Sequence, residues 1–409
     1  MTVIAGRLSA RHSVIAAALL IAALLLVYAV SDRSKAANAS APPALRGDWG
    51  GSFGFSGKKY PILYNHESMS LPGNVKNHGF FLPTFSPDRP EVNPGSPRIV
   101  AAGENTLVSF DVPGEYYLIF SEVAKLKVLV LDRDAAISAN VLRLFDFLTA
   151  NLVVTNGNDR DFYENREQFT VDFFKSSGPK LLFCGPTLLL FEALIRDRFN
   201  LPARDVSLTG VFLEEGQLRY STHNVLEIFL PDKGRWVLFD VNNGLVIKWL
   251  DSFEITEKIR RASKTKQTIA KDEFESIDFD FHYVVDAKHS VNFFDPRSAF
   301  APDMISQESV RAGWPGVAKM FLGGPGYWGG PRFGHRGLPP DYELYLSWYH
   351  EDPFLLTAQL KWQESWGVRV RHVPRLELKR MLNQAYAKQI AEKAWLPYLP
   401  QPNQNATAP

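Results

Sequence analysis

The residue types used in thiol catalysis occur in this chain in the order Cys184, His223 and Asp240. Cys184 is the single cysteine among 409 residues, and it stands two positions before Pro186 in an apolar run that extends to Phe199. Because proline suits the first turn of a helix, this run predicts a buried helix that begins at the cysteine. The partial positive charge and unpaired N–H groups of a helix N-terminus lower the pKa of a thiol and can stabilise an oxyanion. Cys184 is therefore a candidate nucleophile for acyl transfer.

His223 and Asp240 lie on a predicted β-hairpin. The alternating pattern predicts strands at 217–230 and 235–241, joined by a Pro-Asp-Lys-Gly turn. Pairing of residue 230 with residue 235 makes His223 and Asp240 diagonal neighbours on one face, with Cα atoms about 7–8 Å apart. A carboxylate at that distance fixes the tautomer of the imidazole, whose other nitrogen can then accept the thiol proton. A β-bulge would instead give this orienting role to Asn242, as in Cys-His-Asn enzymes.

The sequence around these residues resembles the transglutaminase-like superfamily. A Pro-Ala-Arg turn at 202–204 follows the cysteine helix, His223 lies within a strand, and the segment 234–240 reads Gly-Arg-Trp-Val-Leu-Phe-Asp. The resemblance extends over about 133–250. It implies a papain-like α+β core, in which a helix bearing the cysteine packs on an antiparallel sheet bearing the histidine and the aspartate. It also implies that Cys184 is the nucleophile, His223 the general base and Asp240 the orienting acid.

Two positions depart from the pattern of that superfamily. Its usual His-Ala-Trp is His223-Asn224-Val225 here, and its usual Asp-Pro is Asp240-Val241. Upstream of Cys184 we identify no counterpart for an oxyanion-hole side chain. Two hypotheses therefore stay open. The first is a cysteine peptidase, amidase or acyltransferase that works through a thioester. The second is a catalytically inactive scaffold of the same fold that binds a protein partner or an envelope polysaccharide.

The N-terminus contains an uncharged apolar segment, 13–31, that is long enough to cross a bilayer core of about 30 Å as a helix. Arg7 and Arg11 precede this segment, which favours a cytoplasmic N-terminus and a body in the periplasm or another extracytoplasmic space. The alternative is a cleaved signal peptide with small-residue cleavage sites at 37–41. Because the apolar run exceeds the usual length of a signal-peptide core, we expect an uncleaved signal anchor over 1–31. Among the relatives that the resemblance implies, bacterial members with such an anchor are more often regarded as peptidases than as cross-linkers.

Composition divides the rest of the chain into regions. We expect a tether over 32–60, a β-rich region over 61–132, the α+β core over 133–250, an α/β extension over 251–395 and a disordered tail over 396–409. Within the core, the apolar spacing predicts helices ending near residue 151 and at 166–175, and a strand at 205–213. Within the extension, we expect helices at 252–272 and 375–395, strand-like segments at 275–300 and 341–373, and a loop at 313–340.

The segment 323–330 combines glycines with Tyr327 and Trp328. Such a segment could form a flexible loop that stacks on sugars, but an irregular surface loop is the simpler interpretation. It is not a phosphate-binding loop, because no Gly-Lys-Ser/Thr follows the glycines.

Composition excludes several classes of protein. Lys and Arg total 45 against 44 Asp and Glu, so the formal net charge of +1 lacks the basic excess of a nucleic-acid binder. A single cysteine cannot form an internal disulfide or a cysteine-based zinc finger. The remaining histidines show no i, i+4 pairing with a nearby acid, so we expect no metal and no cofactor. The expected partners are a peptide or protein substrate and, through 13–31, a membrane.

Overall fold

The computed structural model describes residues 60–72, 93–103, 105–119, 125–154, 162, 164–175, 180–263, 269–284, 316–328, 343–349, 352–365, 367 and 369–400. These residues belong to one structural unit, Ser52–Pro409. The predicted anchor over 1–31 and all but the last residue of the tether over 32–60 lie outside the described residues. Among the residues that are described, no helix combines the length and the apolar character needed to cross a bilayer.

An eight-stranded sheet is the largest in the described part of the chain, and its strand order is β13-β12-β11-β10-β9-β14-β15-β16. Neighbouring strands are antiparallel except for β15 and β16, which are parallel. The predicted α+β class is therefore confirmed. The predicted boundary near residue 250 falls within this sheet, because strands from both sides of it pair with one another. The strands are β9 (Ala203–Glu214), β10 (Gln217–Leu230), β11 (Arg235–Asp240), β12 (Leu245–Ile247), β13 (Phe281–Val284), β14 (Pro325–Trp328), β15 (Glu343–Leu346) and β16 (Arg369–His372).

The hairpin of β10 and β11 has the register expected from its four-residue turn. Leu230 pairs with Arg235, and the ladder continues without a bulge to Leu226 opposite Phe239. Gly234 closes the turn at a φ of 63°, a conformation that glycine adopts without steric strain. The alternation of side chains and the turn chemistry are both local signals, so the register could be predicted from sequence.

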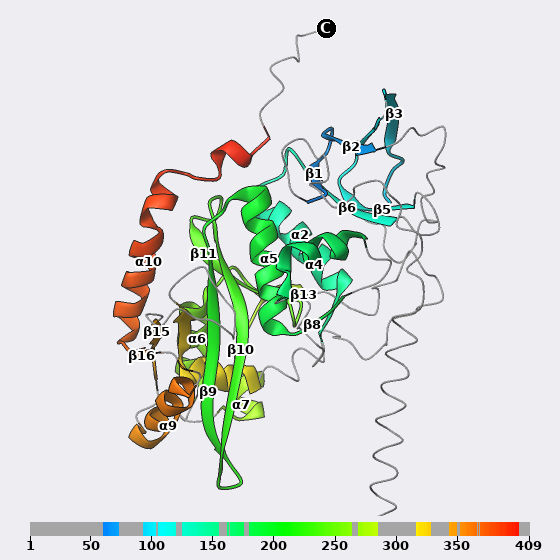
Figure 1. Ribbon diagram of the computed structural model, residues 1–409. Helices are drawn as coiled ribbons and strands as arrows, with labels where there is room; N and C mark the ends of the chain where they lie inside the picture. The colour runs from blue at the N-terminus through cyan, green and yellow to red at the C-terminus, as the bar shows by residue number, and fades with distance from the viewer. Residues whose placement is uncertain are drawn as a thin grey trace, which may run out of the picture. The chain divides into compact units, whose positions relative to one another are not determined.

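Helices α2 (Ile137–Asn151) and α5 (Cys184–Phe199) pack against the sheet. Figure 1 shows α5 running alongside β10, which it contacts together with β9. The rings of Phe145 and Phe191, one from each helix, meet the ring of Phe239 on β11 at centroid distances of 5.6 and 5.8 Å. The apolar stripe predicted after Cys184 is thus buried against the strands that bear His223 and Asp240, and this docking positions the cysteine.

The opposite sheet face carries a separate apolar cluster, to which Val225, Leu238 and Val206 contribute. It packs against α6 (Ser252–Ala262), α7 (Lys271–Glu275), the helical residues 316–323 and two residues of α10 (Arg375–Ala391), Leu378 and Leu382. The sheet therefore has helices on both faces, and both faces of β10 and β11 are held in place. Helix α9 (Pro353–Glu364) contacts β9.

Short sheets and helices precede this core. A three-stranded sheet has the order β1-β6-β5 and a second has the order β2-β4-β3, while β7 and β8 form a parallel pair. Arg198 of α5 is fully buried and donates to Glu67 at 2.8 Å, which ties the cysteine helix to the turn between β1 and β2. The elements are β1 (Ile62–Tyr64), β2 (Ser68–Pro72), β3 (Arg98–Ala102), β4 (Asn105–Ser109), β5 (Gly114–Ile119), β6 (Lys125–Leu131), β7 (Leu152–Val154), α4 (Arg166–Lys175) and β8 (Lys180–Leu182).

The prediction of a loop over 313–340 is wrong where the structure describes that segment. Residues 316–323 are helical, and β14 lies in the sheet between β9 and β15. Tyr327 is buried and stacks on Phe253 with 5.4 Å between the ring centroids, so it is not part of an exposed sugar-binding loop. Gly324 has a φ of 102°, and a Cβ there would lie 1.3 Å from the carbonyl oxygen of Ser347. The glycine therefore permits a close approach of two segments, whereas the sequence pattern suggested a flexible loop.

Three further predictions for the extension and the tail need correction. The segment 341–373 was expected to be strand-like, but α9 lies between β15 and β16. The helix expected over 252–272 is divided into α6 and α7, and the segment between residues 263 and 269 lies outside the described residues. The tail begins with an ordered 3-10 helix, η3 (Leu396–Tyr398), while 401–409 lie outside the described residues, as do 285–300.

Candidate active site

Cys184 is the first residue of α5, and its side chain is buried. Phe183 precedes it in an extended conformation and provides no side-chain cap for the helix. First-turn N–H groups that a cap would otherwise satisfy are available to other acceptors. One of them, the N–H of Gly185, lowers the pKa of the thiol. The predicted start of the helix at the cysteine is therefore confirmed.

His223 on β10 is hydrogen-bonded to Asp240 at the end of β11, with 2.8 Å between Nε2 and Oδ2. Asp240 is fully buried. Because an ionised carboxylate only accepts hydrogen bonds, Nε2 carries the proton of this bond. Nδ1 is then the ring nitrogen that remains for the thiol. The pairing of His223 with Asp240 that the hairpin register predicts is present in the structure.

The turn after β11 holds the carboxylate of Asp240 in place. The backbone N–H of Asn243 donates to Oδ1 at 3.2 Å, and its side-chain Nδ2 donates to Oδ2 at 2.7 Å. The same Nδ2 lies 3.4 Å from Nε2 of His223. Asn243 thus fixes the carboxylate that in turn fixes the imidazole.

Asn242 was the alternative orienting residue, and the structure assigns it no such contact. It is buried, but among the described residues it forms no hydrogen bond with His223. The ladder lacks the bulge that would have moved Asn242 into the position of Asp240. Sequence reasoning missed Asn243, although an Asn three residues after an Asp in a predicted turn is a recognisable signal for local side-chain hydrogen bonds.

Two consecutive residues of β10 reach the thiol of Cys184. The imidazole of His223 is close enough to lower the pKa of the thiol, and the thiol in turn raises the pKa of the imidazole. Asn224 approaches through its side chain, with Nδ2 at 3.7 Å from Sγ, and its backbone N–H also lowers the pKa of the thiol. The sequence marked Asn224 as a departure from the superfamily pattern, but its contact with the thiol was not predicted.

Opposing influences act on the pKa of the Cys184 thiol. Burial is the largest of them and raises the pKa, because it disfavours the charged thiolate. The hydrogen bond from His223, the positive charge of that imidazole and the N–H donors of Asn224 and Gly185 together outweigh burial. The net result is a thiol pKa below the ordinary value of a cysteine, which favours the nucleophilic thiolate.

The pKa of His223 moves in the complementary direction. Burial lowers it, but the charge of Asp240 and the hydrogen bond to that carboxylate raise it, and Cys184 adds to the increase. The pKa of His223 is thereby raised to about 10. The imidazole of His223 is consequently charged at neutral pH, and its charge favours the thiolate of Cys184. This pair can supply a nucleophile and a proton donor to the same reacting bond.

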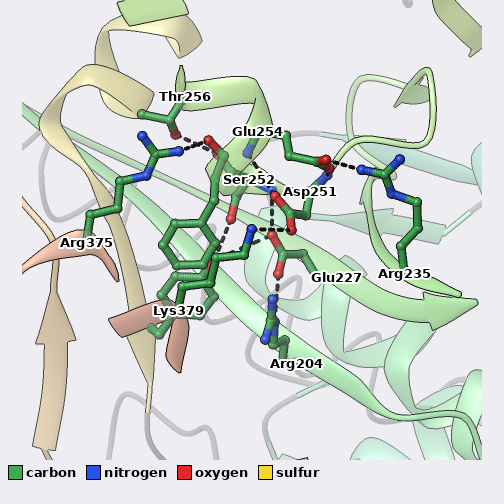
Figure 2. Close-up of polar contacts among 11 residues, drawn as sticks. Arg204, Glu227, Arg235, Asp251, Ser252, Glu254, Thr256, Arg375 and Lys379 are labelled. Carbon is green, nitrogen blue, oxygen red and sulfur yellow. Dashed lines mark hydrogen bonds and ion pairs between the residues drawn. The ribbon is translucent and has the colours of Figure 1, made fainter. Parts of the chain in front are cut away.

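A buried ionic network holds β10 four residues beyond His223. Glu227 accepts a hydrogen bond from Nε of Arg204 at 2.7 Å and another from the backbone of Ser252 at 2.7 Å (Figure 2). The guanidinium of Arg204 also lies over the ring of Trp236, 3.9 Å from its centroid. The arginine of the Pro-Ala-Arg turn and the tryptophan of the Gly-Arg-Trp strand therefore both support the hairpin.

A separate open groove of about 780 Å³ lies between α6, the segment after α7 and α10. Its lining includes five basic side chains but none of the residues that contact the thiol. Several of these cations are paired: Arg375 with Glu257, and Lys248 with Asp280. Within the described ranges, no group of three or more His, Cys, Asp or Glu side chains could hold a metal ion. The lining residues are Lys248, Leu250, Glu254, Glu257, Lys258, Arg261, Ala262, Ser276, Ile277, Asp278, Arg375 and Lys379.

The sequence of this chain matches no known protein family and no curated protein. The site is therefore interpreted from its own geometry. It consists of a thiol at the start of a buried helix, an imidazole that lowers the pKa of that thiol, and a buried carboxylate that orients the imidazole.

Proposed function

We propose that this chain is a cysteine enzyme with a transglutaminase-like core over 133–250, and that it acts on amide bonds through a thioester on Cys184. The observation that carries the proposal is the 2.8 Å hydrogen bond between His223 and Asp240 beside the thiol of Cys184, whose pKa the imidazole lowers. A purely structural role gives little reason for this arrangement, because buried charged groups are often replaceable by apolar residues without loss of stability.

The first half of the reaction forms the thioester. The Cys184 thiolate attacks the carbonyl carbon of the substrate amide, and the electron pair of the carbonyl moves to its oxygen. When the tetrahedral intermediate collapses, the C–N bond breaks and the imidazolium of His223 gives its proton to the leaving amine. Asp240 keeps the ring oriented and stabilises its charged form throughout.

The second half of the reaction releases the acyl group. Neutral His223 accepts a proton from water or from an amine as that nucleophile attacks the thioester carbonyl. The C–S bond then breaks and regenerates the thiolate and the imidazolium. Water yields a carboxylic acid, as in a peptidase or amidase, and an amine yields a new amide, as in an acyltransferase.

Asn224 and the start of α5 supply donors for the carbonyl oxygen. The Nδ2 group of Asn224 lies 3.7 Å from Sγ, and the N–H of Gly185 also points to the sulfur. Donors beside the sulfur can stabilise the negative oxygen that develops on the carbon bonded to it, as the donors of an oxyanion hole do. Asn224 thus provides the side-chain donor for which no counterpart is found upstream of the cysteine.

The experiment uses the purified full-length protein and p-nitrophenyl acetate as an acyl donor. We expect a burst of p-nitrophenolate and an acetyl group on Cys184 by intact-mass and peptide analysis. The burst should be lost in Cys184→Ala and strongly reduced in His223→Ala. Methylamine added to the acetyl-enzyme after the remaining p-nitrophenyl acetate has been removed tests the acceptor, because N-methylacetamide then forms only when the amine resolves the thioester.

The second hypothesis, a non-catalytic scaffold, predicts a different result. In that case Cys184 would be acetylated no faster in the wild type than in His223→Ala, and the single thiol would behave like an ordinary buried cysteine. Such a result would contradict the enzymatic proposal and leave binding of a protein or an envelope polysaccharide as the function to pursue.

We also propose that the segment 13–31 anchors the enzyme in a membrane, with the catalytic unit outside the cytoplasm. The support is the uncharged apolar run after Arg7 and Arg11. Protease added to intact spheroplasts should digest the body of the protein, and carbonate extraction should leave the undigested protein in the membrane fraction. Protection from protease until the cells are lysed would contradict this orientation.

A further inference from the structure

The open groove beside α6 brings together cations from several elements. Its lining comes from the polar face of α6, the first two turns of α10, the segment 276–278 and two residues that precede α6. Five of these side chains are basic and three are acidic, an excess of two positive charges in a chain whose formal net charge is +1. We call it the basic groove. Its basic residues are Lys248, Lys258, Arg261, Arg375 and Lys379, and its acidic residues are Glu254, Glu257 and Asp278.

Glu257 of α6 is shared by three guanidinium groups. Arg260 donates to it at 2.7 Å and Arg261 at 3.0 Å, and Arg375 forms an ion pair with it from α10. The hydrogen bond from Arg260, together with those from Arg261 and Arg375, outweighs burial and lowers the pKa of Glu257 to about 2. One carboxylate cannot neutralise three guanidinium groups. Positive charge therefore remains where α6 and α10 meet.

Two lysines add to this charge. The ammonium group of Lys258 lies over the ring of Phe279, 5.0 Å from its centroid, and within the described ranges it forms no ion pair with a carboxylate. Lys379 reaches toward α6 from α10 and lies 3.9 Å from Asp251, a carboxylate that already accepts the backbone N–H of Glu254 at 2.8 Å (Figure 2). An ammonium group has three donors, so both lysines retain donors for a further acceptor.

Charged residues outside the lining do not remove the excess. Four of them pair with lining residues, and because two are acidic and two are basic, the balance of the groove stays the same. They are Asp251, Asp280, Arg235 and Arg260. A ligand with two negative charges would neutralise the basic groove.

The basic groove is accessible and has an apolar part. The side chain of Arg261 is 76% exposed and that of Lys379 is 41% exposed, so a ligand can reach both. Leu250, Ala262 and Ile277 also line the groove and belong to the apolar cluster between the sheet and α6. The volume of about 780 Å³ lies within the range of about 300–1,000 Å³ that is usual for small-molecule sites. These properties suit a small organic anion with an apolar body.

We propose that the basic groove binds a small organic dianion, whose carboxylate or phosphate groups pair with the cations that α6 and α10 contribute. A guanidinium group forms paired hydrogen bonds with the oxygens of either acid, so the two kinds of anion share this chemistry. None of the lining residues contacts Cys184, so the site is distinct from the one that the proposed reaction uses. The groove therefore adds a second ligand to the proposed enzyme and does not depend on its catalytic activity.

The test is isothermal titration calorimetry of the full-length protein at pH 8 and low ionic strength. The probes are phthalate and phenyl phosphate, which are both dianions at this pH, and benzoate, which has the same ring and one negative charge. We expect one site per chain, and a Kd for the better dianion about tenfold below that of benzoate, as for the loss of one charge-assisted contact. A tighter phthalate would assign the site to dicarboxylates, and a tighter phenyl phosphate to phosphate esters.

Arg261→Gln and Arg260→Gln form a matched pair. Each removes one cation beside Glu257 and leaves that carboxylate with two arginines, but only Arg261 lines the groove. Arg261→Gln should raise the Kd of the better dianion about tenfold, and Lys258→Gln should do the same. Arg260→Gln should change it by no more than about twofold, because an exposed charge that does not contact the ligand is screened by solvent. Thermal unfolding checks that the variants remain folded.

Several results would overturn the assignment. These are no heat of binding with either dianion, an affinity for benzoate equal to that for the dianions, or an equal effect of Arg260→Gln and Arg261→Gln, which would indicate a general effect of charge. Cys184→Ala should bind the dianion as the wild type does, and loss of binding in that variant would place the anion at the thiol instead. If the wild type shows no acylation burst but binds the dianion, the catalytic proposal fails and the groove assignment stands.

Discussion

Nε2 of His223 lies 2.8 Å from Oδ2 of Asp240, across the open end of the hairpin formed by β10 and β11. This contact leaves one ring nitrogen for Cys184 and favours the charged imidazole. The side chains around this pair affect different quantities, namely the pKa of the thiol, the rate of acylation and the stability of the fold, and each can be measured separately.

The pH dependence of thiol alkylation should depend on His223. In the wild type the pKa of Cys184 is lowered, so iodoacetamide should react at pH values where an ordinary cysteine is protonated. In His223→Ala the hydrogen bond and the charge are lost while burial remains, and burial raises the pKa of the thiol. The inflection of the alkylation profile should therefore move above that of a free cysteine. At pH 7 the rate should fall about tenfold for each unit of this movement. An unchanged profile would contradict the ion pair.

Asn224→Leu should separate stabilisation of the thiolate from stabilisation of the oxyanion. The substitution removes the Nδ2 donor that lies 3.7 Å from Sγ. We expect a small rise in the thiol pKa and a reduction of about 10²-fold in the rate of acylation at saturating pH, as for loss of one oxyanion-hole donor. The measurement is the burst rate with p-nitrophenyl acetate from pH 6 to pH 10. If the pH–rate profile shifts along the pH axis but its plateau at high pH is unchanged, Asn224 stabilises only the thiolate and not the oxyanion.

Asn243→Ala and Asn242→Ala form a matched pair that tests which asparagine orients the histidine. Asn243 donates twice to Asp240, whereas Asn242 is buried without a described hydrogen bond to His223. We expect Asn243→Ala to lower the acylation rate about tenfold and to lower the pKa of His223 as Asp240 becomes less well fixed. Asn242→Ala should affect activity less. NMR titration of the His223 ring reports the pKa directly, and the opposite ranking of the two variants would assign the role to Asn242.

Arg204→Met should destabilise the fold without direct contact with the thiol. The substitution leaves the carboxylate of Glu227 buried without its hydrogen-bonded cation, a change that typically costs about 3–5 kcal/mol. Urea unfolding followed by far-UV circular dichroism would give the free energy of unfolding. The double variant Arg204→Met with Glu227→Leu removes both charges and should recover most of the loss. If the double variant is as unstable as the single one, the stacking of Arg204 on Trp236 matters more than the ion pair.

Local sequence signals predicted a large part of this architecture. The strand 217–230 and the helix 166–175 have the predicted bounds, and the hairpin register follows from its turn. Alternation, helical spacing and turn residues act over a few positions, so they can be recognised without knowledge of the rest of the chain. The prediction failed for the segment 323–330, whose glycines suggested a loop. In the structure these glycines allow segments of the chain to pack closely around β14, and the sequence alone does not distinguish a glycine needed for close packing from one in a loop.

The sequence alone determined that a cysteine begins a helix and that a histidine and an aspartate are diagonal neighbours on one hairpin. Only the tertiary structure decided that α5 packs against β10 so that the thiol meets His223 and Asn224. It also decided that Asn243, and not Asn242, fixes Asp240, and that α6 and α10 bring basic side chains to one groove. The physical reason is that backbone spacing sets local register, whereas contacts between distant elements depend on how all of the apolar faces are buried together.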